Sequence, residues 1–124
     1  MITLRQAIYL IGFIFLFSSC ATSMSPVQVH NTLPSLTKSR YLTYTQAEEA
    51  VKTNNCKFLV QGREYVAPLA ITTKGDLRNG AKGIDEWVEL DGGNAYVIKS
   101  FKWIRVDESG VTQLNIVFDT LLCE

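Results

Sequence analysis

The sequence predicts an α+β fold, a small, mainly antiparallel sheet of three or four strands with one main helix packed on one face. A helical apolar period runs through residues 76–90. Apolar, strand-like segments precede and follow it at 56–65 and 94–106, and a last segment, 111–123, alternates between apolar and polar residues. The resulting core, strand–helix–strand–strand, favours one sheet covered by the helix.

The segment before this core predicts a short helix over residues 45–52, because Thr45 and Glu48 have the spacing of a capping box. In the first strand, Gly62 suggests a bulge or a turn. The segment that follows is ambiguous, since Pro68 disfavours a central strand.

The main helix has one apolar face at spacings of four, three and four residues, formed by Leu77, Ala81, Ile84 and Val88. Thr73 or Asp76 can cap its start, and Gly92 or Gly93 can end it in a left-handed turn. Each glycine inside a helix lowers its stability by about 1 kcal/mol relative to alanine. The internal glycines, 80 and 83, therefore predict a close approach of the helix to the sheet.

The last two strands form the predicted hairpin. Imperfect alternation around Lys99 and Ser100 suggests a bulge, and the connection 107–110, "DESG", ends in a glycine suited to positive φ. In the final strand, one face collects Leu114, Ile116, Phe118 and Leu122. The other face collects Gln113, Asn115 and Asp119, so we expect a strand covered on one side by the helix.

The composition predicts one domain and excludes some partners. The chain has 124 residues, with 12 basic and 12 acidic side chains, so a nucleic-acid surface is not expected. The stretch 75–83 lacks the Gly-Lys-Ser/Thr ending of a phosphate loop, which argues against nucleotide binding. The acids of 85–91 lack the pattern of a calcium loop and suggest a solvated helix face. Trp87 and Trp103 are expected in the core.

The N-terminus has the pattern of a secretory signal peptide. Arg5 precedes an apolar run of 11 residues, 7–17, which ends at Ser18, Ser19 and Cys20. A transmembrane anchor needs about 20 apolar residues, so this run is too short to span a bilayer.

The stretch "LFSSC", residues 16–20, resembles a bacterial lipobox, with Phe17 where Leu is most usual. The resemblance implies cleavage between Ser19 and Cys20, diacylglycerol on the Cys20 sulfur and acylation of the new amino group. Ala21, in place of Asp, implies sorting to the outer membrane, facing the periplasm. An ordinary secreted protein is the main alternative.

Three segments follow from this interpretation: a lipoprotein signal peptide, 1–19; a lipidated cysteine and flexible tether, 20–39; and a globular domain, 40–124. The tether is rich in Ser and Thr and contains Pro26 and Pro34. The single histidine, His30, falls in it, so we expect no catalytic, metal-binding or cofactor-binding residue.

The two remaining cysteines, Cys56 and Cys123, form an even pair in an exported protein, which predicts a disulfide. Two free buried thiols are the alternative. Cys123 faces away from the Leu114 side of its strand, so the strand parity leaves the pairing open.

The stretches "CKFLVQG" and "GIDEWVELDGGNAYVI" are similar to the cysteine-bearing first strand and the Gly-x-Asn-Ala-Val junction of RcsF-like outer-membrane stress-sensor lipoproteins. The resemblance covers about 50 residues and implies a strand–helix–strand–strand core with a disulfide. That family uses four cysteines and this domain has two, so no sensing or active-site residue is implied.

We therefore expect a non-enzymatic envelope lipoprotein, held on the membrane by the lipid on Cys20 and binding an envelope protein or the cell wall as a sensor or accessory module. The alternative is an inhibitor or immunity-type lipoprotein that protects the envelope from a hydrolase. Neither function requires a cofactor.

Mass spectrometry of the mature protein tests the anchor. We expect an N-terminus at Cys20 carrying diacylglycerol and an amide-linked acyl chain, and we expect C20A to remain uncleaved. An unmodified Cys20, or cleavage elsewhere, would contradict the lipobox.

Overall fold

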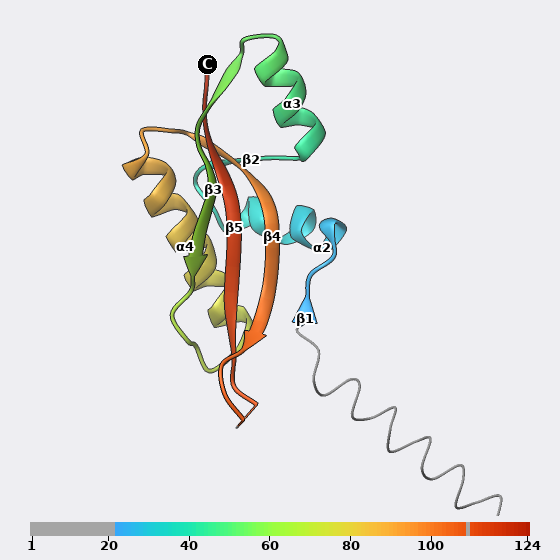
Figure 1. Ribbon diagram of the computed structural model, residues 1–124, viewed down its shortest axis with the longest axis vertical. Helices are drawn as coiled ribbons and strands as arrows, with labels where there is room; N and C mark the ends of the chain where they lie inside the picture. Colours follow the sequence, from blue (N-terminus) through green and yellow to red (C-terminus); the bar gives the residue numbers. More distant parts are fainter. Residues whose placement is uncertain (1–21, 109) are drawn as a thin grey trace, which may run out of the picture.

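The structure of the chain, a computed structural model, describes residues 22–108 and 110–124 (Figure 1). The predicted signal peptide, 1–19, and the predicted lipidation site, Cys20, lie outside the described residues. The described part confirms the α+β class, with a mixed sheet and one main helix packed against it.

The sheet is built around two long antiparallel strands, β4 (Ala95–Arg105) and β5 (Thr112–Cys123). On the far side of β5 lies β3 (Cys56–Val66), also antiparallel. On the far side of β4 lie two short strands that the sequence did not predict. These are β1 (Thr22–Ser23), antiparallel, and β2 (Arg40–Leu42), parallel.

The main helix, α4 (Thr73–Leu90), begins three residues before the predicted start. Its N-cap is Thr72, whose hydroxyl accepts a hydrogen bond from the Gly75 amide at 3.0 Å, so the two predicted caps were wrong. Thr72 is extended, as an N-cap must be, whereas the predicted caps lie inside the helix. The predicted C-terminal turn is confirmed at Gly92, where φ is +80°.

The predicted close approach of this helix to the sheet is confirmed at both internal glycines. A Cβ on Gly83 would lie 2.0 Å from the Tyr65 ring, and one on Gly80 would lie 2.9 Å from Ile116 Cδ1. Of the predicted apolar face, Leu77 is half-buried, and the other members are buried.

The predicted irregularities of the strands are also confirmed. The register between β3 and β5 shifts between Phe58 and Arg63, close to Gly62. The register between β4 and β5 shifts between Ile98 and Ser100. Gly110, at the end of the hairpin connection, has a φ of +88°.

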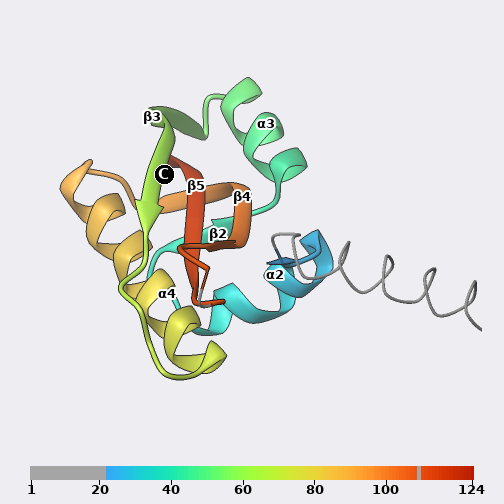
Figure 2. The ribbon, with the colours of Figure 1, turned by 60° about the horizontal axis from the view of Figure 1, so that its bottom comes forward.

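We predicted that β5 is covered on one face only, and this prediction was wrong for the second half of the strand. Residues 118–121 are all buried, whereas Leu122 is 38% exposed. The reason is a second helix, α3 (Tyr44–Lys52), which lies on the other side of the sheet from α4 (Figure 2). Its capping box is formed by Thr43 and Gln46, two residues before the predicted pair of Thr45 and Glu48.

Two apolar cores result, one on each face of the sheet. The larger core lies under α4 and contains the sheet residues Tyr96, Phe101, Trp103, Leu114, Ile116 and Phe118. The smaller core lies under α3 and contains Leu42, Ala47, Cys56, Ala95, Val97, Leu121 and Cys123.

The described part of the predicted tether is folded. It contains α2 (Pro26–Thr32) and a 3-10 turn, η1 (Leu33–Ser35), and a capping box of Ser25 and Gln28 starts α2. Val29 and Leu33 enter the larger core, with 4% and 0% exposure. Of the two prolines taken as spacer residues, Pro26 is the first residue of α2 and Pro34 the second residue of η1, positions where a missing amide hydrogen bond has no cost.

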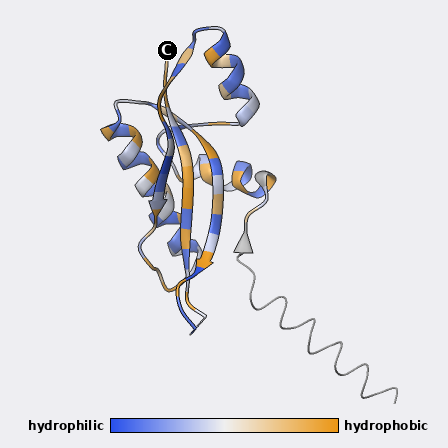
Figure 3. Cartoon of the chain, viewed as in Figure 1, coloured by the Kyte–Doolittle hydropathy of each residue, from blue (hydrophilic) through white to orange (hydrophobic). Residues whose placement is uncertain are grey.

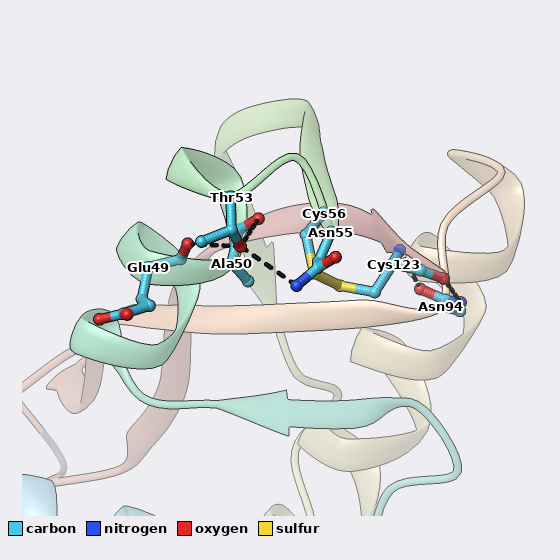
Figure 4. Close-up of a disulfide and its surroundings, with 7 residues drawn as sticks. All are labelled: Glu49, Ala50, Thr53, Asn55, Cys56, Asn94 and Cys123. Carbon is cyan, nitrogen blue, oxygen red and sulfur yellow. Dashed lines mark hydrogen bonds between the residues drawn. A yellow bond between two sulfur atoms is a disulfide. The ribbon is translucent and has the colours of Figure 1, made fainter.

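The predicted disulfide between Cys56 and Cys123 is present, and the two residues are direct register partners across β3 and β5 (Figure 4). The parity objection disappears because Cys123 lies in the smaller core with Leu121, on the face that Cys56 also shares. Beyond the pair, the Glu124 amide donates to the Asn55 carbonyl at 2.9 Å.

The Asn94 side chain bonds the main chain of Cys123. Its Oδ1 accepts from the Cys123 amide at 2.8 Å, and its Nδ2 donates to the Cys123 carbonyl at 2.7 Å (Figure 4). Its own amide donates to the Leu121 carbonyl, and its carbonyl accepts from the Arg40 amide. The side chain thus continues the pairing beside β5 by one position, and the main-chain carbonyl of Asn94 fixes the start of β2.

Removing the disulfide should lower the free energy of unfolding by about 4 kcal/mol, because the bond closes a long loop of the unfolded chain. Urea unfolding of C56A/C123A, compared with the oxidised wild type, measures the loss. A loss below about 1 kcal/mol would contradict a stabilising role of the bond.

Asn94→Ala should lower the free energy of unfolding by about 2–3 kcal/mol, because it leaves the amide and carbonyl of Cys123 without partners at a nearly buried position. Asn55→Ala is the matched control beside the same disulfide, since the Asn55 side chain bonds only the exposed Thr53 hydroxyl. Equal losses in the two variants would contradict the role assigned to Asn94.

Candidate functional site

The outer edge of β4 is left open in its middle. β2 pairs with residues 95–97, and β1 pairs with residues 102–103, with one further hydrogen bond from the Met24 amide to the Phe101 carbonyl. Between these two segments, no described strand pairs with residues 98–100 on this edge. The gap exists because both short strands turn away into helices, β1 into α2 and β2 into α3.

An apolar groove of about 420 Å³ lies over this gap. We call it the α2–β4 groove. Its walls come from three segments: α2 together with Met24, the junction of β2 with α3, and the stretch of β4 from Ile98 to Phe101. Its lining residues are Met24, Val27, Val29, His30, Tyr41, Thr43, Tyr44, Ile98, Lys99, Ser100 and Phe101.

One wall of the groove continues into the larger core through aromatic contacts. The ring of His30 meets Tyr41 edge-on at 5.6 Å, and Tyr41 meets Tyr96 edge-on at 5.8 Å. The Tyr96 hydroxyl bonds the Thr37 hydroxyl at 2.8 Å. Burial raises the pKa of both phenols, so they stay protonated and neutral at physiological pH.

The groove has one cation, Lys99, which stands at the β4 bulge. Its Nζ lies 3.4 Å from a carboxylate oxygen of Asp119 and 5.1 Å from the centre of the Tyr44 ring. The Asp119 side chain is only 2% exposed and also accepts from the Gly62 amide at 2.8 Å. Lys99 thus balances the buried Asp119 carboxylate and lies beside the Tyr44 ring in the groove lining.

The acids of 85–91 do not all form a solvated face. The Asp85 carboxylate accepts from the amides of Lys38 and Ser39 at 2.8 and 2.9 Å. The Asp91 carboxylate pairs with Arg63 and accepts from the Thr120 hydroxyl. Both acids therefore hold α4 to its neighbours, and this part of the solvated-face prediction was wrong.

Other polar clusters are also structural. The Arg63 guanidinium lies 4.0 Å from the centre of the Trp87 ring, which secures the end of α4 over β3. The nearly buried Asp76 accepts from the Trp103 indole at 3.1 Å and from the Ala70 amide at 3.1 Å. Trp103 is 8% exposed, which confirms its place in the core.

The predicted site residues do not converge. Cys56 and Cys123 form the disulfide, at the opposite end of β4 and β5 from the hairpin, and Cys20 lies outside the described residues. His30 is exposed on α2 at the groove rather than in a tether. Within residues 22–108 and 110–124, no cluster of three His, Cys, Asp or Glu side chains could hold a metal ion. Among the helices of the same part, none is both long and apolar enough to cross a bilayer.

The groove was missed because one of its walls lies in the segment interpreted as a tether. A signal was present: "SPVQ", residues 25–28, combines an N-cap serine, a proline at the first helical position and a glutamine at the third. Val29 and Leu33 follow at a spacing of four, which is one turn of a helix face.

Comparisons of the chain with protein-family models, with curated proteins and with solved structures found no match. The chemistry of the groove therefore has to be interpreted from its own residues. It offers apolar and aromatic contact, an open strand edge and one cation that is already paired, an arrangement suited to binding an apolar group.

Proposed function

We propose that the protein is a bacterial envelope lipoprotein, anchored through Cys20, whose domain binds a partner protein through the α2–β4 groove and catalyses no reaction. The observation that carries the proposal is the apolar groove over an open strand edge. Large apolar hollows with few polar groups are typical of binding sites.

The disulfide supports export. Disulfides persist in oxidising compartments, such as the bacterial periplasm, and are rare in the cytosol. The bond between Cys56 and Cys123 fits the compartment to which the signal peptide and lipobox would direct the chain. The resemblance of the Gly-Gly-Asn-Ala junction to RcsF-like lipoproteins points to the same compartment.

The partner we propose is an extended polypeptide segment with an apolar side chain. An extended segment can pair with an exposed strand edge through its main chain while a side chain fills an adjacent hollow. In β4 the unpaired stretch is short, residues 98–100, and it contains the bulge, so pairing alone would be weak. The groove walls, with Phe101 and Tyr41 among them, would supply most of the binding free energy.

Site-specific cross-linking tests this proposal in cells. A photo-reactive amino acid at Tyr44, which is 57% exposed on the groove rim, should give a discrete adduct. The same amino acid at Leu90, which is 75% exposed at the end of α4 and does not line the groove, is the matched control. Identification of the adduct by mass spectrometry names the partner.

Adducts of equal yield at both positions, or none at either, would contradict binding at the groove. A hydrolase as the cross-linked protein would identify the protein as an inhibitor or immunity-type lipoprotein, the alternative for the same anchored domain. Phospholipid in place of a protein adduct would mean that the groove holds an acyl chain and would overturn the proposed peptide partner.

A further inference from the structure

The described chain enters the sheet at the hairpin end. In β1, Thr22 pairs with Trp103 and Ser23 with Lys102, so β1 traced backward points toward the hairpin that joins β4 to β5 (Figure 1). The end of β3 and the start of α4 lie at this same end, since the Ala67 amide donates to the Leu114 carbonyl and Asp76 accepts from Trp103. We call this the hairpin end, opposite the disulfide.

Exposed apolar side chains gather at the hairpin end. Of the eleven large apolar residues that are exposed among the described residues, six lie there. Ile71 is the extreme case, at 105% exposure, and Leu69 is at 54%. The six are Val66, Leu69, Ile71, Ile104, Val106 and Val111. Figure 3 shows hydrophobic residues in the β3–α4 connection and at the end of β4.

Two of these side chains, Leu69 and Ile71, stand on a fixed loop between β3 and α4. The connection 67–72 is tied down at three points: Gln113 Nε2 donates to the Ala67 carbonyl, Asn79 Nδ2 donates to the Pro68 carbonyl, and the Ala70 amide donates to Asp76. The neighbours of Ile71 are therefore anchored to the sheet and to α4 while its side chain stays in solvent. A concentration of exposed apolar side chains marks a surface that contacts a partner or a membrane.

The short chain length between Cys20 and β1 indicates that the membrane is the partner of this surface. Only residue 21 separates Cys20 from Thr22, and a residue spans at most about 3.6 Å, so the Cα atoms of Cys20 and Thr22 are within about 7 Å. We propose that the hairpin end is a membrane-docking surface, with Ile71 and Leu69 inserted in the lipid interface beside the acyl chains of Cys20. This inference rests on the proposed lipid anchor and adds the orientation of the domain.

The charged residues at the hairpin end do not by themselves favour the proposed orientation on the membrane. Lys74 and Arg78 stand on the exposed side of the first turns of α4, whereas Asp107 and Glu108 lie at the hairpin tip. With both signs present, the apolar side chains and the nearness of the anchor determine the orientation, and headgroup charge is secondary.

Depth-dependent fluorescence quenching tests the orientation. The full-length lipidated protein is purified from membranes and reconstituted into vesicles of phosphatidylethanolamine, phosphatidylglycerol and phosphatidylcholine brominated along its acyl chains. I71W and L69W replace exposed side chains, and L90W, at the far end of α4, is the matched control. The emission of wild-type Trp87 and Trp103 is subtracted, and disulfide formation checks the fold of each variant.

We expect I71W and L69W to lose intensity to the bromines and shift their emission to shorter wavelength, with no change for L90W. Quenching of I71W no stronger than that of L90W, in protein whose lipidated N-terminus mass spectrometry has verified, would overturn docking while the lipoprotein stands. A blue shift of I71W without quenching would assign this end to a second copy of the chain, which also overturns docking. An unmodified Cys20 would overturn the anchor and, with it, this inference.

Discussion

The fixing of Cys123 is the constraint on which the rest of the domain depends. Its side chain is bonded to Cys56 of β3, and its main chain is bonded on the other side by the Asn94 amide group. The last residues of β5 are thereby held between both neighbouring strands, where a chain end would otherwise fray. The main-chain carbonyl of the same residue, Asn94, accepts from the Arg40 amide at the start of β2.

The sheet is covered on both faces. With β5 in the centre, its second half is buried under α4 on one face and under α3 on the other. The path of β2 into α3 and of β1 into α2 then leaves β4 open between them. The groove is thus a consequence of two short strands that pair with β4 only at its ends.

The long elements were predictable because their patterns are local. The period of α4, the bulges in β3 and β4 and the turn at Gly110 depend on neighbours along the chain. The second covered face was not predictable, because Leu121 is buried in the smaller core under α3, which is distant in sequence. The groove was missed for the same reason: α2 is too short to be stable alone and is held by Val29 and Leu33 in the core.

Both functional proposals require residues 22–35 to be part of the fold, since α2 forms a wall of the groove and β1, which precedes α2, brings the described chain to the hairpin end. Amide hydrogen exchange of the lipidated protein, measured residue by residue, tests this most directly. We predict that the Val29 and Leu33 amides are protected, as is the amide of Ile116 in β5. Exchange of Val29 and Leu33 at the rate of an unstructured peptide, with Ile116 still protected, would contradict the account and restore a flexible tether.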